Sequence, residues 1–505
     1  MTDHSLFPTN SGQAGTIWPG LRAGIRRLDW VALAAFVLPL LLYRQTLAPT
    51  IYNLDSAEFT TAVATNGLVR ATGYPLYLAL GKLWTWLPLS ADMGYRLNLF
   101  SAVCGAATIF LADRILRRLH VGAWARLGAL GLLAAAPYFW SLSLVAEVYT
   151  LHTAMMAGVI LALLRWADAP SPARLALPVL LMTLSLGNHA ATILLVPGCL
   201  WFVLTRHPRQ LADKRVWLAG GAAIILGAAV FMTLPLRHAQ QPAFNYAGVY
   251  DAHGRFVPVN LQTAEGLVWL LTGESFAGQM FGYSWAEVGG QVGAYGRQLA
   301  LAFLGIGLGP GVAGLFVLLR RDWRLGGLLL LMFIANAIFY INYRVIDKNT
   351  MYLPTYLIWA LWLGIGCQVL LDLWNSAAGR VWALRGVLLT AVLLAVISNW
   401  HLVDLSADWS TREQSEAILS AVEPNALVLG WWDTIPAIQY LQLVEGQRPD
   451  VLAVNRFLIS GEDMNALILQ EIDRRPVYIN NPSIELLGVA RATAVGPLYR
   501  LESRE

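Results

Sequence analysis

Long apolar segments recur along this 505-residue sequence, and they limit its possible folds more than any other feature. The hydrocarbon core of a bilayer is about 30 Å thick, so a helix needs about 20 mostly apolar residues to cross it. Several segments have that length, and only 13% of all residues are charged, against about 25% in soluble proteins. The sequence therefore predicts a polytopic α-helical membrane protein.

The apolar segments predict about eleven transmembrane helices. Their expected ranges are 28–47, 93–116, 121–141, 145–166, 173–186, 189–206, 215–236, 294–319, 325–342, 351–373 and 384–401. Lys and Arg collect in cytoplasmic loops, which provides an independent test. Alternate loops on one side carry about twice as many basic residues as those on the other. We therefore expect a cytoplasmic N-terminus and a C-terminus outside.

Composition divides the chain into three parts. Residues 1–27 are polar and rich in Gly, Pro and Ser, which predicts a disordered cytoplasmic segment. Residues 28–402 form the predicted membrane domain, with long outside loops at 48–92 and 237–293 that contain interfacial helices. Short apolar segments at 426–430, 451–455 and 476–480 are typical of strands that alternate with helices. They predict a small α/β domain outside the membrane at 403–505.

Cysteine usage and net charge exclude several classes of site. Cys104, Cys199 and Cys367 each lie within an apolar segment, so neither a disulfide framework nor a zinc-binding spacing is indicated. The net charge of +4 is small and gives no indication of a nucleic-acid partner.

Two carboxylates directly follow the first predicted helix. Asp55 and Glu58 are three residues apart, so they share one face of a helical turn. Such a pair can accept a proton from a hydroxyl nucleophile or hold a cation, which makes a divalent metal a candidate cofactor. The alternative is a structural one, because this spacing also resembles a helix capping box.

Arg237 ends the seventh predicted helix on the outside, where the distribution of basic residues disfavours it. A guanidinium matches the oxygens of a phosphate, so an anionic ligand would explain its presence. Alternatively, its side chain extends from the membrane surface into solvent.

Further ionisable residues fall at outside helix ends or in short outside turns. They are Glu147, His189 and Asp347, each of which also has a structural interpretation as a first-turn acid, a hydrogen-bonded turn residue or a partner of Lys348. A transporter more often places such groups near the bilayer midplane. Because all of these groups are predicted on one side of the bilayer, the pattern favours chemistry at the membrane surface on a substrate held in the membrane.

The segment Pro49–Phe59 begins a series of motifs that resembles a known family. The series continues through Gly73–Tyr77, Ala146–Tyr149, Leu184–His189, Leu234–Arg237 with Asn245-Tyr246, Tyr352–Tyr356, Trp432–Thr434, Tyr440 and Arg448–Val451. The chain is similar to multispan proteins whose vertebrate member is an O-mannosyltransferase of plexin-type receptors. These proteins look like GT-C glycosyltransferases, which use polyprenyl-phosphate sugars.

The resemblance implies roles for individual residues. Asp55 matches the catalytic carboxylate of the first outside loop, and Glu58 matches the second acid of that motif. This chain departs from the family at two places. Arg70-Ala71-Thr72 stands where relatives have a His-Pro pair, and Tyr246 stands where they have Trp. The first departure is expected to alter the acceptor or donor head-group pocket.

The resemblance implies a GT-C-like bacterial inner-membrane enzyme with a periplasmic C-terminal domain. It would transfer a sugar, with inversion, from a polyprenyl-phosphate donor to a hydroxyl of a protein, lipid or glycan. Asp55 would act as general base, and Arg237, helped by His238 or Arg344, would bind the donor phosphate. The other expected pocket residues are Tyr74, Glu147, Tyr149, His189, Asn245, Asp347 and Tyr352. The alternatives are a transporter or flippase of lipid-linked sugars, and a binding or assembly protein that has lost activity.

Overall fold

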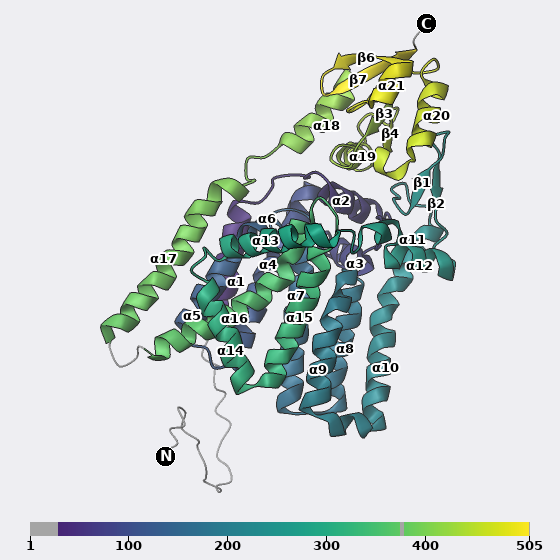
Figure 1. The fold of residues 1–505 in the computed structure, drawn as a ribbon. Coiled ribbons are helices and arrows are strands. Elements are labelled where there is room, and N and C mark those ends of the chain that lie inside the picture. Colours follow the sequence, from purple (N-terminus) through teal and green to yellow (C-terminus); the bar gives the residue numbers. More distant parts are fainter. Residues whose placement is uncertain (1–28, 374–377, 504–505) are drawn as a thin grey trace, which may run out of the picture.

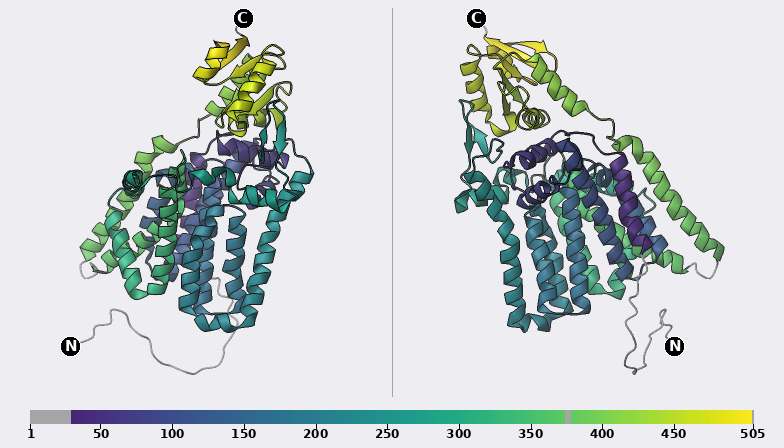
Figure 2. Two further views of the ribbon diagram at one scale, coloured as in Figure 1. Left: turned by 45° about the vertical axis from the view of Figure 1, so that its right-hand side comes forward. Right: turned by 180° about the vertical axis from the view of Figure 1, so that it is seen from behind.

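The computed structural model describes residues 29–373 and 378–503, so the expected disordered segment at 1–27 lies outside the described residues. A bundle of long helices forms one part, and a small α/β domain stands on one end of it (Figure 1). The views in Figure 2 show that the α/β domain lies over the bundle rather than beside it.

Eleven helices among the described residues coincide with predicted membrane segments. They are α1 (Trp30–Gln45), α4 (Met93–Arg118), α5 (Ala123–Ala134), α7 (Tyr149–Asp168), α8 (Pro172–Leu186), α9 (Val196–Arg206), α10 (Lys214–Ala228), α14 (Leu308–Arg321), α15 (Trp323–Ile341), α16 (Leu353–Leu373) and α17 (Ala378–Val403). Within the described part of the chain, six helical stretches are long and apolar enough to cross a membrane. The fold is a multi-pass helical one, and the number of crossings stays a prediction.

Several predicted helices are divided in the structure, and two of these divisions have a clear backbone cause. The segment 294–319 belongs to α13 (Trp285–Ala302) and α14, which are separated by Leu304 and Gly305 at positive φ. The segment 121–141 belongs to α5 and α6 (Pro137–Ser141), because Pro137 lacks the N–H that a continuous helix requires. Apolar composition alone did not indicate either break.

Shorter elements cover the end of the bundle that faces the α/β domain (Figure 1). They are α2 (Asp55–Thr65), α3 (Pro75–Trp84), α11 (Thr233–Ala239), the hairpin β1 (Gly248–Tyr250) and β2 (Phe256–Pro258), and α12 (Ala264–Thr272). Short 3₁₀ segments are η1 (Ala190–Leu195), η2 (Pro208–Ala212), η3 (Ala229–Met232), η4 (Glu274–Gln279) and η5 (Lys348–Tyr352). The segments 48–92 and 237–293, which we predicted to be outside loops, thus form a structured layer.

The C-terminal domain contains one mixed sheet with the order β4-β3-β5-β7-β6. Its elements are α18 (Ser410–Ala421), β3 (Leu427–Gly430), α19 (Ile435–Leu443), β4 (Leu452–Asn455), η6 (Arg456–Leu458), α20 (Gly461–Glu471), β5 (Val477–Ile479), α21 (Ile484–Val489), β6 (Ala490–Val495) and β7 (Leu498–Ser503). The three predicted strands are β3, β4 and β5, and they pair in parallel. The antiparallel pair β6 and β7 was not predicted.

The two parts of the molecule share an apolar core. Ile51 and Ala57, at the start of the first outside layer, belong to one buried cluster with Ile435, Ile438 and Leu441 of α19. Burial of apolar surface stabilises this contact by about 25 cal/mol for each Å² removed from water. The α/β domain is therefore packed directly on α2, the helix that begins with Asp55.

Candidate active site

The carboxylates of Asp55 and Glu58 lie on one face of the first turn of α2, as their spacing predicted. Helix α2 is preceded by Leu54, whose φ of 55° lies in the left-handed region and whose side chain makes no capping contact. Neither acid completes a capping box, since both point at the same cation. The two acids therefore do not act as helix caps, which was the structural alternative for this pair.

The shared cation is Arg70. Its guanidinium lies 2.7 Å from a carboxylate oxygen of Asp55 and 2.8 Å from Oε2 of Glu58. The backbone N–H of Arg70 also donates to Oε1 of Glu58 at 2.9 Å. Sequence reasoning noted Arg70 only as a departure from the family pattern. That departure, a basic residue in the loop after two acids, was the available signal.

An aromatic residue of the C-terminal domain contacts both Asp55 and Arg70. Nε1 of Trp432 donates to Oδ1 of Asp55 at 3.1 Å. The ring of Trp432 also lies over the Arg70 guanidinium, with 4.3 Å between Cζ and the ring centroid. Phe276 lies on the guanidinium at a longer distance of 6.0 Å. The Arg70 cation is thus enclosed by two carboxylates and two aromatic rings.

The two carboxylates differ in burial. The Glu58 side chain is 1% exposed, whereas that of Asp55 is 16% exposed. Burial raises the pKa of Glu58 to about 8, although the neighbouring Arg70 guanidinium opposes this shift. Burial also raises the pKa of Glu147 and of Asp347, and the charge of Asp55 adds to the shift of both. Glu147 and Asp347 are therefore electrostatic neighbours of Asp55.

Three more predicted pocket residues, all with aromatic rings, meet beside these acids. The His189 ring lies 6.1 Å from that of Tyr74 and 5.5 Å from that of Tyr149, measured between centroids. Tyr74 has a φ of 44° and precedes Pro75, so its side chain is fixed where α3 begins. Burial lowers the pKa of His189 to about 4, so the imidazole is neutral at physiological pH.

Arg237 lies on the same side of the molecule but near the other end of α2. Its Nη1 donates to the carbonyl of Gly67 at 2.9 Å, just beyond the last residue of α2. An 11-residue helix is about 16 Å long, so Asp55 and Arg237 lie near opposite ends of α2. Lys82 also binds this end, donating to the carbonyls of Val63 and Ala64.

Lys82 was not among the predicted site residues. Burial and the nearby charge of Arg237 lower its pKa, so the two cations repel one another. An anion bound between them would relieve this repulsion. A lone Lys in an amphipathic helix gave no signal of this pairing in the sequence.

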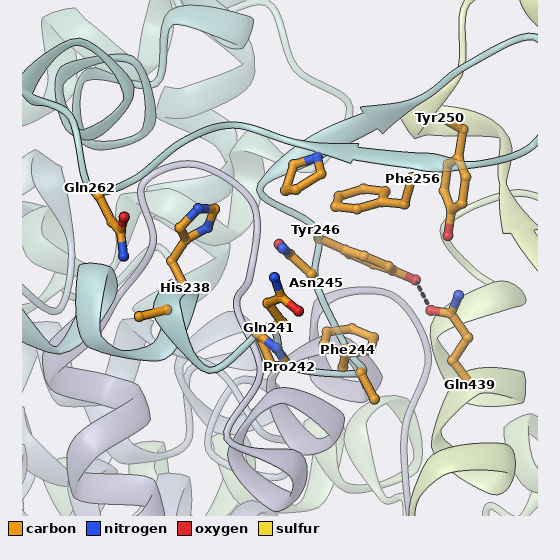
Figure 3. Close-up of a pocket in the computed structure, with 13 residues that line it drawn as sticks. His238, Gln241, Pro242, Phe244, Asn245, Tyr246, Tyr250, Phe256, Gln262 and Gln439 are labelled. Atoms are coloured by element: carbon orange, nitrogen blue, oxygen red, sulfur yellow. Dashed lines mark hydrogen bonds between the residues drawn. The ribbon is translucent and has the colours of Figure 1, made fainter.

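His238 and Asn245 line a cavity of about 450 Å³ between the hairpin and the C-terminal domain. In Figure 3, His238 and Gln262 lie on one side of the cavity, and the Tyr246 hydroxyl points at Gln439 on the other. That hydrogen bond is 2.6 Å long. The cavity is lined by aromatic rings and amides, and its wall at Tyr246 packs on Trp432 with 5.1 Å between ring centroids.

Arg344 and Tyr352 have partners outside the acid group. The Arg344 guanidinium lies 3.7 Å from Glu287 and donates to the carbonyl of Gly282. Tyr352 packs on Tyr295 with a centroid distance of 4.5 Å. Lys348 donates to Tyr283 and Gln291 rather than to Asp347. Within residues 29–373 and 378–503, no three His, Cys, Asp or Glu side chains are grouped to hold a metal ion.

Similarity to known proteins agrees with the resemblance inferred from the motifs. A family model for the N-terminal domain of the protein O-mannosyl-transferase TMEM260 matches residues 55–212. The protein O-mannosyl-transferase tmem260 of Dictyostelium discoideum is 20% identical over 85% of this chain and 57% of its own length. The mouse protein O-mannosyl-transferase TMEM260 is 23% identical over 85% of this chain and 63% of its own. This chain spans about three fifths of the length of these relatives.

Two solved structures have the same fold along nearly the whole chain. ArnT from Cupriavidus metallidurans bound to undecaprenyl phosphate superposes with a TM-score of 0.59 at 12% identity, over 94% of this chain and 96% of ArnT. Its apo state gives a TM-score of 0.56 at 12% identity, over 94% of this chain and 97% of ArnT. The chain thus has a GT-C-like multi-pass helical fold, and its residues 55–212 match the N-terminal domain of the TMEM260 protein O-mannosyl-transferases.

Proposed function

We propose that this protein is a GT-C glycosyltransferase that transfers a sugar, with inversion, from a polyprenyl-phosphate donor to an acceptor hydroxyl on the outer side of the membrane. The observation that carries the proposal is the group formed by Asp55, Glu58 and Arg70 at the start of α2. It lies in a region that matches the TMEM260 domain and in a fold shared with an undecaprenyl phosphate-binding protein.

Asp55 is the proposed general base. When the two acids share one guanidinium, the proton resides on the carboxylate that is more costly to ionise, which is the buried Glu58. Asp55 is more exposed and is left to accept the proton of the acceptor hydroxyl as that oxygen attacks the anomeric carbon. General-base help of this kind is worth about 10²–10⁴ in rate. Glu58 then serves to hold Arg70 in place.

Two separate cationic positions are available for the donor phosphate. Arg237 and Lys82 are proposed to bind it as the lipid enters from the membrane, because an anion relieves the repulsion between them. Arg70 lies beside Asp55 and is placed to stabilise the charge that develops on the leaving phosphate. His238 and Arg344 remain proposed secondary contacts to the phosphate.

The acceptor is proposed to enter through the cavity that contains His238, Asn245 and Tyr246. Its amides and aromatic rings suit a neutral, hydrogen-bonding acceptor. The names of the relatives favour mannose as the sugar and a protein hydroxyl as the acceptor. Tyr74, Tyr149, Glu147, His189 and Asp347 surround Asp55 and are proposed to contact the sugar, whereas Tyr352 supports η5.

The test uses the full-length protein in detergent with undecaprenyl-phosphate mannose labelled in the sugar. Envelope proteins from a strain that lacks this gene serve as the acceptor. We expect label in protein together with released undecaprenyl phosphate, and loss of both in Asp55→Asn. Glu265→Gln is the matched control, since Glu265 is an exposed acid of α12.

Near-normal transfer by Asp55→Asn would contradict the assignment of the base. A flippase would instead move the labelled lipid between leaflets of a vesicle without releasing lipid phosphate. The acid group begins α2, at the end of the bundle that the α/β domain covers rather than midway along the bundle, and this position supports the transferase over the flippase (Figure 1).

A further inference from the structure

We propose that the C-terminal α/β domain completes the catalytic site, and that Trp432 is a positioning residue for the Asp55 carboxylate. This inference rests on the proposed function only in taking Asp55 as the base. It gives the α/β domain a role in the reaction itself, rather than a separate role in recruiting a partner.

Trp432 makes two contacts at once. Its indole N–H donates to Oδ1 of Asp55 at 3.1 Å, and its ring covers the Arg70 guanidinium at 4.3 Å. The ring is held in turn by Tyr246, at a centroid distance of 5.1 Å, and by Phe457, at 5.2 Å. Trp432 is 9% exposed, so its neighbours hold the ring in one orientation.

The fold explains why this residue reaches the membrane domain. Trp432 follows the carboxyl end of β3, and in open α/β sheets functional groups gather at that edge of parallel strands. Helix α19 begins directly afterwards and packs on α2 through the shared apolar cluster of Ile435, Ile438 and Ala57. The same contact thus fixes both the indole and the helix that carries Asp55.

Polar contacts also fix the position of the α/β domain relative to the membrane domain. Arg412 of α18 donates to the Thr50 hydroxyl at 3.3 Å and lies 3.7 Å from Asp92, just before α4. The Tyr246 hydroxyl donates to Gln439 of α19 at 2.6 Å. Motion of the α/β domain away from α2 would therefore break these contacts together with the hydrogen bond to Asp55.

The indole N–H fixes the rotation of the Asp55 carboxylate, so that the other lone pairs of Asp55 face the acceptor. The titratable groups that face Asp55 are Glu58, Arg70, Tyr74, Glu147, Tyr149 and Asp347. Among them, Arg70 also lies against the Trp432 ring, so a variant at this position alters that contact as well.

The experiment compares Trp432→Phe with Trp431→Phe in the full-length protein, using labelled undecaprenyl-phosphate mannose. Trp431 is the matched control, because it is the preceding residue but stacks on Arg456, with 4.5 Å between Cζ and the ring centroid. We expect Trp432→Phe to lower kcat about tenfold, the effect of one hydrogen bond to a charged group. KM for the donor should change little, because Trp432 contacts the base rather than the donor.

A second variant isolates the N–H from the ring. Replacement of Trp432 by β-(3-benzothienyl)alanine keeps the size of the ring and exchanges the N–H for sulfur. It should reproduce the fall in kcat while the melting temperature stays close to that of the wild type. Trp431→Phe should match the wild type in kcat and in KM.

Three outcomes overturn the inference. They are an unchanged kcat in both Trp432 variants, a fall in kcat that occurs only together with a lower melting temperature, and an equal fall in kcat in Trp431→Phe. Failure of the proposed function has a different signature, since Asp55→Asn would then remain active. The two failures can therefore be told apart in one set of assays.

Discussion

At the scale of single residues, the central feature is one guanidinium shared by two carboxylates of unequal burial. Arg70 balances only one of the two negative charges, and Glu58 is the acid that burial makes more costly to ionise. The spacing of Asp55 and Glu58 predicted that they face the same way. It could not predict their partner, because Arg70 reaches them through a loop whose path depends on α2 and α3 together.

The raised pKa of Glu58 predicts how stability depends on pH. With a pKa of about 8 in the folded protein and an ordinary value of 4.5, folded Glu58 keeps a proton that the unfolded chain has lost. Rising pH between these values therefore favours unfolding. We expect the melting temperature of Glu58→Gln to fall less steeply than that of the wild type from pH 5 to 8. Parallel curves in a thermal scan would contradict this assignment.

Arg237 and Arg70 should affect different kinetic constants. Arg237 lies near the far end of α2 from Asp55, so it can bind the donor without sensing the transition state. We expect Arg237→Ala to raise KM for undecaprenyl-phosphate mannose about 10-fold or more, as loss of a charged hydrogen bond would, with kcat within a few-fold of the wild type. Arg255→Ala is the control, since that side chain is 74% exposed. A loss confined to kcat would place Arg237 in the chemistry instead.

At the scale of helices and strands, apolar length predicted the positions of the long helices but not their interruptions. The break between α13 and α14 depends on backbone turns at Leu304 and Gly305, which have no effect on hydropathy. Strands β6 and β7 were missed because their outward faces are polar and their pairing is made only across the folded sheet. The 3₁₀ segments and the interfacial helices likewise depend on tertiary contacts.

Close helix packing gives a prediction at this scale. A Cβ added at Gly314 of α14 would lie 1.8 Å from the carbonyl oxygen of Trp362 in α16, whereas one at Gly309 would meet nothing within 4 Å. Backbones that touch in this way tolerate only small residues. We expect Gly314→Val to lose most of the monodisperse protein in size-exclusion chromatography, and Gly309→Val to retain it. Equal yields of monodisperse protein from the two variants would contradict the close packing of α14 against α16.

At the scale of the whole molecule, the elements that carry the candidate site all lie at the end of the bundle that the α/β domain covers (Figure 1). They are α2 with the acid group, α3 and α11 with Lys82 and Arg237, and the hairpin of β1 and β2 beside the aromatic cavity. Basic residues predominate at the opposite end, for example Arg206, Arg209 and Lys214 around the connection between α9 and α10. The sequence predicted this polarity from the distribution of charge. It could not predict that the C-terminal domain supplies a contact to Asp55, because only the packing of α19 on α2 brings Trp432 there.

This polarity predicts which sites a membrane-impermeant maleimide can reach in intact cells whose outer barrier has been removed. In a background with Cys104, Cys199 and Cys367 replaced by alanine, Asp473→Cys after α20 should be labelled, because we predict that the α/β domain lies outside. Ala212→Cys, between α9 and α10, should be labelled only after the membrane is permeabilised. Both native side chains are exposed, so burial does not explain a difference. Labelling of Ala212→Cys in intact cells would reverse the orientation and place the acid group on the cytoplasmic side, where the proposed acceptors are absent.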